Sequence, residues 1–156
     1  MLEIMTRDFG PATYSEDEIF DFAGGLPGFP DCERFLTVRP RPDEPLVVLQ
    51  SLERPEVAFL TIPLDALAGA YELRIREEDR RALGAGTGSL YALVIVTLPS
   101  QGSATVNLLG PIVLDPSTRR GIQAIRDDNR YGAAEPFDLL LDEHNPRVVR
   151  ERALCS

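Results

Sequence analysis

The sequence predicts a mainly β fold of short antiparallel strands, arranged as a barrel or a sandwich, with one short helix. Short apolar segments recur along the chain, and turn signals rich in Gly and Pro separate them about every ten residues. Only the stretch 76–83 has a clear helical pattern. With 156 residues, of which 44% are hydrophobic, the chain can bury one core. These observations favour a single all-β domain.

The expected strands of the N-terminal half are bounded by strand breakers. Residues 1–9 alternate loosely between apolar and polar side chains and predict a first strand, which Gly10-Pro11 ends. The run Ser15-Glu-Asp-Glu fits a capping box, so a helical turn competes there with a short strand over 19–22. Further strands are expected at 33–38, 46–52 and 57–62.

Two segments of this half are predicted to be loops. The run at 24–30, Gly-Gly-Leu-Pro-Gly-Phe-Pro, is too rich in Gly and Pro for a regular element and predicts an ordered loop. Its Leu26 and Phe29 are expected to be buried in the core. The alternative is that both side chains are exposed and contact a partner. Residues 39–45 contain three prolines, which lack the N–H that a sheet requires, so this segment is expected to be extended and exposed.

In the C-terminal half the helix is followed by the most apolar strand. Residues 63–68 predict one helical turn and residues 71–75 a short strand. The helix at 76–83 places Glu77 four residues before Arg81, the favourable order of an ion pair, and Gly84 is its expected C-cap. Leu90 to Leu98 predicts a central strand that is buried on most of both faces. The last strands are expected at 105–109, 112–114 and 119–125, with a turn at 115–118.

Four blocks of the sequence carry a resemblance to a known family. They are GGLPGFPDCERF at 24–35, LVVLQSLERPEVAFLTI at 46–62, LYALVIVTLP at 90–99 and TVNLLGPIVLDPSTRRGIQAI at 105–125. In content, order and spacing they closely resemble the FliW family of flagellar assembly factors. The resemblance implies a compact antiparallel β-barrel-like domain over 1–131 and favours the strand at 19–22. The tail, 132–156, lies outside it and is expected to be helical or disordered.

The family pattern also sets an expectation for the helix. FliW proteins usually have a small capping residue where Arg76 stands here. A helix without a hydroxyl cap loses about 1 kcal/mol of stability at its first turn. We therefore expect a weaker helix N-terminus in this chain.

The resemblance implies a regulatory binding protein. FliW proteins bind flagellin in the cytoplasm. When free of flagellin they bind and antagonise the carbon storage regulator, an RNA-binding protein that represses translation of flagellin mRNA. The implied partners are therefore flagellin and this regulator, and the implied unit is a cytoplasmic monomer. The alternative is a flagellin chaperone, or a small-ligand-binding β-barrel, without the translational role, because a fold does not fix a function.

The charge of the chain favours a protein partner over nucleic acid. The formal net charge is −9, and residues 1–44 carry ten acidic side chains against four arginines. Such a surface repels phosphate but raises the rate of association with a basic protein. The alternative is that the acidity only keeps the protein soluble. No apolar run is long enough for a membrane span and the N-terminus lacks the apolar core of a signal peptide, so we expect a cytoplasmic protein without membrane contact.

No residue pattern indicates catalysis or a metal site. His144, the only histidine, lies in the tail, which would have to fold back for His144 to pair with Cys32 or a serine. Cys32 and Cys155 lack a metal-binding spacing, and a disulfide between them is not expected in a reducing compartment. The run Asp127-Asp128-Asn129 lacks the glycine and the distant glutamate of a calcium loop. We expect neither an enzyme nor a bound cofactor.

Several residues are candidates for contact with a partner. Gln50 and Asn107 are polar residues in apolar strands, and each is either a structural amide or a partner contact. Arg119 and Arg120 could pair with acidic groups of flagellin, or form a solvated strand edge that discourages aggregation. The full set of candidates is Leu26, Phe29, Gln50, Asn107, Arg119 and Arg120.

Overall fold

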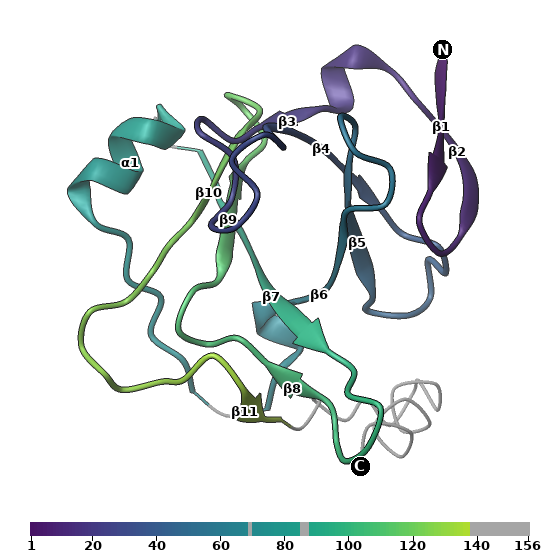
Figure 1. Ribbon diagram of the computed structural model, residues 1–156. Coiled ribbons are helices and arrows are strands. Elements are labelled where there is room, and N and C mark those ends of the chain that lie inside the picture. The colour runs from purple at the N-terminus through teal and green to yellow at the C-terminus, as the bar shows by residue number, and fades with distance from the viewer. Residues whose placement is uncertain (69, 85–87, 138–156) are drawn as a thin grey trace.

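A computed structural model describes residues 1–68, 70–84 and 88–137 of the chain, and its main feature is a closed β-barrel (Figure 1). The barrel strands are β3 (Phe20–Asp21), β4 (Arg34–Val38), β5 (Val47–Ser51), β6 (Ala58–Pro63), β7 (Tyr91–Thr97), β9 (Ile112–Asp115) and β10 (Arg120–Gln123). Their order around the barrel is β7, β6, β5, β4, β3, β10 and β9, and β9 closes the ring by pairing with β7. Neighbours are antiparallel except β3 and β10, which are parallel. The predicted mainly β, barrel-like fold is confirmed.

Side chains alternate along the barrel strands between the interior and the outer face. On β7, Leu93 and Ile95 belong to the inner cluster, whereas Val94 and Val96 belong to a separate cluster. The buried members of the inner cluster are Phe20, Phe22, Leu26, Cys32, Phe35, Val47, Leu49, Val57, Leu93, Ile112 and Leu114. Successive side chains of a strand point to opposite faces. β7 is apolar on both faces because its inner face belongs to the barrel core and its outer face to a second buried cluster.

The α-helix of the described residues, α1 (Glu77–Leu83), covers part of this outer face beside β10 (Figure 1). Its last residue, Leu83, joins Val113 in a buried cluster. The helix ends at Gly84, whose φ of +62° is the left-handed conformation that glycine adopts most readily. The Arg76 side chain at the N-cap accepts no hydrogen bond from the N–H groups of the first turn and instead donates to the Asp79 carboxylate at 3.3 Å. The missing cap that the sequence predicts is therefore confirmed.

Short elements extend the sheet and cover its other outer cluster. β8 (Thr105–Val106) pairs with the last residues of β7, and β11 (Glu135–Pro136) pairs with β8. The 3-10 turn η2 (Leu64–Ala66) confirms the predicted helical turn after Pro63. The described chain therefore packs onto the barrel as far as Phe137, which joins this cluster. The rest of the predicted tail, 138–156, lies outside the described residues.

The N-terminal residues form a hairpin, β1 (Leu2–Thr6) and β2 (Gly10–Tyr14), and not the single strand that was expected. The Thr6 hydroxyl accepts the Phe9 N–H at 3.0 Å and donates to the Gly10 carbonyl at 2.7 Å, which fixes the turn. Pro11 fits β2 because a strand at a sheet edge can lack a donor on its unpaired side. The prediction that Gly10-Pro11 ends the strand was therefore wrong: this pair begins the second strand of the hairpin.

After the hairpin the chain satisfies both interpretations that competed there. The 3-10 turn η1 (Glu16–Glu18) carries the predicted capping box at Ser15, and β3 follows immediately. The capping box favours helical geometry only locally, so a strand can begin two residues later.

Residues 71–75 do not form the predicted strand. The Arg126 side chain donates to the carbonyl of Glu72, and the Tyr71 hydroxyl donates to the carbonyl of Leu108 at 2.8 Å. Leu73 and Ile75 still pack against the barrel. The alternation that predicted a strand therefore reflects the burial of alternate side chains. A side chain, and not a neighbouring strand, provides the hydrogen bond to the Glu72 carbonyl.

Two further strands are shorter or more exposed than expected. β8 ends at Val106, because the side-chain oxygen of Asn107 accepts the Gly110 N–H at 3.0 Å and turns the chain. β7 is central, but it is buried on both faces only in its middle. Tyr91, at its start, is 64% exposed.

Candidate functional site

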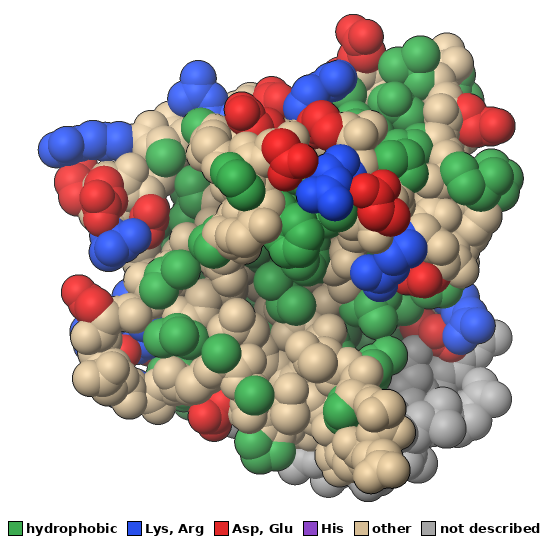
Figure 2. Space-filling view, viewed as in Figure 1, with side chains coloured by type: hydrophobic (Ala, Val, Ile, Leu, Met, Phe, Trp, Pro, Cys, Tyr) green, Lys and Arg blue, Asp and Glu red, His purple; other side chains and the backbone are tan. Residues whose placement is uncertain are grey.

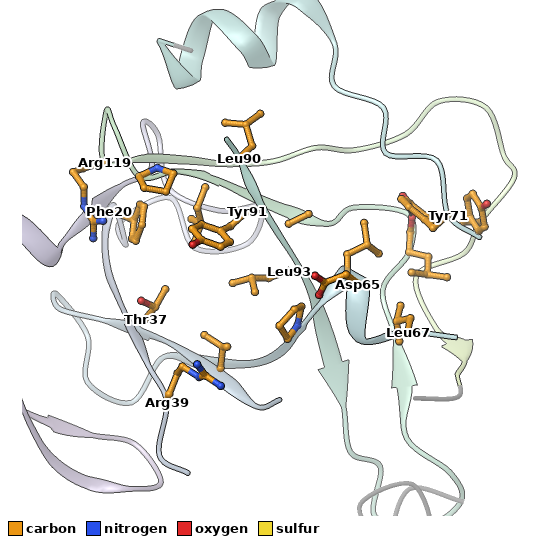
Figure 3. A pocket seen from close by; sticks show the side chains of 18 of the residues that line it. Phe20, Thr37, Arg39, Asp65, Leu67, Tyr71, Leu90, Tyr91, Leu93 and Arg119 are labelled. Carbon is orange, nitrogen blue, oxygen red and sulfur yellow. Dashed lines mark hydrogen bonds between the residues drawn. The ribbon is translucent and has the colours of Figure 1, made fainter. Parts of the chain in front are cut away.

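One end of the barrel is open and forms a cavity of about 990 Å³, referred to below as the mouth (Figure 3). The starts of β3, β5 and β7 and the ends of β4, β6 and β9 meet here, because neighbouring strands run in opposite directions. The strand residues that line the mouth are Phe20, Thr37, Val47, Pro63, Tyr91, Ala92, Leu93 and Leu114, and Arg119 lines it just before β10. Six of the seven barrel strands, all except β10, thus contribute to this one site.

The floor of the mouth is the core of the barrel itself. Val47, Leu93 and Leu114 belong to the inner cluster, and Leu93 lies near the centre of the view in Figure 3. Tyr91 stands two residues before Leu93 and therefore on the same side of β7, but its side chain is largely exposed. An aromatic ring at the rim of an apolar floor can contact another molecule without disturbing the core.

The opposite end of the barrel is closed by the segment 22–33, which connects β3 to β4. Leu26 is buried in the inner cluster, and the Phe29 ring packs edge to face on Phe59 with 5.4 Å between centroids. Gly25 has a φ of +72°, and a Cβ on it would lie 2.3 Å from the Phe29 carbonyl oxygen. Glycine is therefore required for this loop to fold back into the barrel.

Two arginines line the mouth, and both are held by carbonyl groups of the chain. The Arg119 guanidinium stacks 3.7 Å from the Phe20 ring centroid and donates to the carbonyls of Ile19 and Glu18. Arg119 has a φ of +56°, so it belongs to the turn before β10 and not to the strand that was expected to begin with it. Arg39 donates to the carbonyl of Pro42 at 3.0 Å.

Asp65 differs from these arginines. It lies on η2 beside the mouth and its side chain is exposed (Figure 3). Within the described residues its carboxylate has no hydrogen bond or ion pair. The mouth therefore offers one carboxylate that is not engaged by the described part of the chain.

One wall of the mouth is fixed by a buried arginine. The Arg126 side chain is 1% exposed and binds both carboxylate oxygens of Asp128, at 3.0 and 2.5 Å. Its guanidinium carbon lies 5.2 Å from the Tyr71 ring centroid and 4.8 Å from that of Tyr131. Both tyrosines line the mouth, so Arg126 holds this wall in place.

The same cluster perturbs the titration of its members. The hydrogen bond from Arg126 lowers the pKa of Asp128 to about 2. Burial raises the pKa of the Tyr71 hydroxyl. At neutral pH the ion pair is therefore fully charged and Tyr71 keeps its proton, the form that donates to the Leu108 carbonyl.

Gln50 lies on the outer face of the barrel, away from the mouth. It is 0% exposed, and its side-chain oxygen accepts the Arg7 N–H at 2.9 Å. Its side-chain nitrogen donates to the carbonyl of Pro55 at 2.8 Å and to that of Ser51 at 3.1 Å. Gln50 thereby fastens the hairpin to the barrel, and in this structure it presents no surface to a partner.

The structure does not bring the six predicted contact residues together. Leu26 and Phe29 close the far end, and Asn107 turns the chain after β8. Arg120 begins β10 beside the C-cap of α1, where a Cβ on Gly84 would lie 2.8 Å from its Nη1 atom. Of the six, only Arg119 lines the mouth.

The other residues of the mouth were not predicted from the sequence. Tyr91 could have indicated the mouth, because it is a polar aromatic residue at the start of an apolar strand and lies on the same face as the inward-facing Leu93, two residues later. Asp65 and Arg126 gave no signal, because an isolated acid in a turn and an arginine after a strand are common on protein surfaces.

Two further features of the described residues concern metal sites and buried polar groups. Among them no three His, Cys, Asp or Glu side chains cluster as a metal site would require, and every buried side-chain polar atom has a partner. Buried Asp115 accepts the backbone N–H and the hydroxyl of Ser117, and the hydroxyl contact is the main cause of its lowered pKa. None of the helices in the described part of the chain has the length and apolarity to cross a membrane.

Comparison with known proteins gives one consistent family. Residues 3–137 match the sequence model described as FliW protein. The flagellar assembly factor FliW of Symbiobacterium thermophilum is 39% identical over 125 residues, covering 78% of this chain and 90% of that protein. That of Caldanaerobacter subterraneus subsp. tengcongensis is 31% identical over 139 residues, covering 87% and 93%. A crystal structure of the flagellar assembly factor FliW matches with a TM-score of 0.79 and 28% identity, over 85% of this chain and 94% of that one.

Proposed function

The chain belongs to the FliW family of flagellar assembly factors, and from this membership we propose that it acts by switching between two protein partners. It binds flagellin and, when free of flagellin, binds and antagonises the carbon storage regulator. Antagonism relieves the translational repression of flagellin mRNA. The observation that carries this proposal is the family match across residues 3–137, which spans the whole described barrel. The role is one of binding in the cytoplasm, by a monomer and without catalysis.

The charge of the chain supports antagonism of an RNA-binding protein. A protein that grips RNA must present Arg and Lys to phosphate. This chain carries a net charge of −9, so once docked beside such a face it lowers the local positive potential and repels RNA. Figure 2 shows acidic and arginine side chains interspersed on one face of the molecule. On this face the proposed effect therefore rests on the net charge and on particular acids, because acids and arginines alternate there.

The experiment is calorimetric titration of the purified protein with flagellin and, separately, with the carbon storage regulator, both from the same source. We expect saturable binding to each, and we expect flagellin to reduce binding of the regulator. Release of a flagellin mRNA fragment from the regulator should weaken as salt rises, because screening shortens the range of the repulsion.

The outcomes separate the two parts of the proposal. Binding to flagellin alone leaves a flagellin chaperone and removes the translational role. Binding to neither partner, by a protein whose circular dichroism shows the native β fold, contradicts the proposal as a whole. Antagonism that does not change with salt contradicts only the electrostatic account.

A further inference from the structure

We propose that the mouth of the barrel is the docking site for the basic, RNA-binding partner, and that it receives an apolar side chain of that partner flanked by Arg or Lys. This inference rests on the proposed function and names the site and the chemistry of one of its two contacts. Three features of the mouth carry it: an apolar floor, an exposed aromatic rim and a carboxylate without a partner among the described residues.

The apolar floor fixes the first requirement on the partner. At the far end of the barrel the chain fills the interior with its own Leu26, whereas at the mouth Val47, Leu93 and Leu114 form the floor of an open cavity. A cavity of about 990 Å³ has room for more than one side chain of a docked segment. Burying an apolar side chain on this floor removes water from both surfaces, which is the main source of affinity at the centre of a protein interface.

The rim sets the second requirement, through the one charged side chain there that has no partner in the described chain. Four charged side chains line the mouth: Arg119 and Arg39 donate to carbonyls of the chain itself, and the Glu18 carboxylate accepts the Ser15 N–H at 2.9 Å. Asp65 remains, on η2, as a carboxylate without a partner in the described chain. A carboxylate beside an apolar cavity forms its most favourable ion pair with an Arg or Lys of the partner that lies next to the partner's buried apolar side chain. A partner that binds RNA through a basic face supplies that chemistry, and the net charge of −9 favours the encounter.

The wall beside this cavity is already rigid. Arg126 holds Tyr71 and Tyr131 in place in the chain as it stands. A preformed wall loses little conformational entropy when a partner docks, which increases the affinity that a given contact area provides. Tyr91 adds an exposed ring of the kind that is enriched at the energetic centres of interfaces.

The test compares two exposed substitutions at the mouth with two matched controls away from it, in the full-length protein. Thr37→Arg places a long cationic side chain on the wall of the mouth, and Thr13→Arg makes the same change on the exposed face of the hairpin. Asp65→Lys reverses the charge on η2, and Glu33→Lys makes the same reversal before β4, at the closed end. All four positions are exposed, so melting temperatures close to that of the unchanged protein are expected and are checked first.

Affinity for the carbon storage regulator is then measured by calorimetry at two salt concentrations. T37R should weaken binding at least about tenfold and D65K about fivefold, with a shallower salt dependence for D65K. T13R and E33K should stay within about twofold of the unchanged protein. If the unchanged protein does not bind the regulator, the proposed function fails; if it binds and T37R binds equally well, this inference alone fails.

The other possible occupants of the mouth are separated by the same variants. A loss of flagellin binding in T37R with regulator binding intact would assign the mouth to flagellin and overturn the inference. A change in sedimentation of T37R with both affinities intact would assign the mouth to a second copy of this chain, and would overturn the inference as well.

Discussion

The closed end and the mouth of the barrel are formed by the same seven strands, but the chain completes them differently. At the closed end the connection 22–33 folds back, buries Leu26 and stacks Phe29 on Phe59. At the mouth the connections stay at the rim, so Leu93 forms the floor of a cavity and Tyr91 remains exposed. In the described chain, one end is filled by the chain's own side chains and the other forms an open cavity.

This difference separates stability from binding. Leu26 at the closed end is buried in the inner cluster, so its removal creates a cavity that the rest of the core cannot fill. Exposed side chains at the mouth gain little from folding and can be altered at small cost to stability. The wall built on Arg126 combines the two properties, because its arginine is buried while its tyrosines line the mouth.

The largest expected effect is at the closed end. Leu26→Ala should lower the free energy of unfolding by about 3 kcal/mol, because it removes a buried side chain from a packed core. Urea denaturation measures this change. Leu98→Ala makes the same substitution at a position that is 60% exposed and should change the free energy by less than about 0.5 kcal/mol. Equal costs at the two positions would show that the connection 22–33 does not close the barrel.

The wall of the mouth is expected to come next. Arg126→Gln should cost about 2 kcal/mol, because the substitution removes the buried guanidinium that binds both Asp128 and the Glu72 carbonyl. The near-ultraviolet circular dichroism of the tyrosines should change as well, since two of them stack on this arginine. Arg80→Gln, on the exposed face of α1, is the matched control and should alter neither property. A tyrosine signal that stays unchanged in R126Q would argue against the positioning role.

A smaller effect is expected on acidification. The pKa of Asp128 is about 2 in the folded protein, below the 3.8 of an unperturbed aspartate. The ionised form is therefore favoured by folding, so its stabilisation is complete above about pH 4 and is lost as pH falls towards 2. Thermal unfolding between pH 5 and pH 2 measures the loss. Asp128→Asn should reduce the slope over this window, and an identical slope would mean that Asp128 does not contribute.

The smallest effect on stability is expected at the rim. Tyr91→Ala should change the free energy of unfolding by less than about 1 kcal/mol, since the side chain is 64% exposed in the folded protein. If the mouth is a docking site, the same variant should bind the regulator several-fold more weakly, which calorimetry measures. A large loss of stability would instead place Tyr91 in the core and remove the contrast between the two ends.

The features that could be predicted are those with local signals. Period-two alternation predicted most of the barrel strands, and the capping box at Ser15 and the C-cap at Gly84 are visible within a few residues of sequence. The run 24–30 predicted an ordered loop that carries Leu26 and Phe29 into the core, and both side chains pack against the inner cluster. Family resemblance added closure into a barrel, which alternation alone left open against a sandwich.

The features that were missed depend on contacts distant in sequence. Residues 71–75 alternate like a strand, but an arginine more than fifty residues away takes the Glu72 carbonyl. For Gln50 the sequence leaves open a structural amide and a partner contact; in the structure its side-chain oxygen accepts the N–H of Arg7, forty-three residues before it, and the side chain is buried. A local pattern reports whether a side chain is buried, but not which other segment buries it.

By itself the sequence determined most of the barrel strands, the helix cap, the closing loop, the acidic charge and the family, because each depends on neighbouring residues or on blocks that match the family in order. Only the tertiary structure decided where the barrel is open. The mouth unites residues from Glu18 to Tyr131, and it exists because β9 pairs with β7 and completes the ring. Ring closure is a long-range event that no single segment encodes, and it alone sets Asp65 and Tyr91 around one apolar floor.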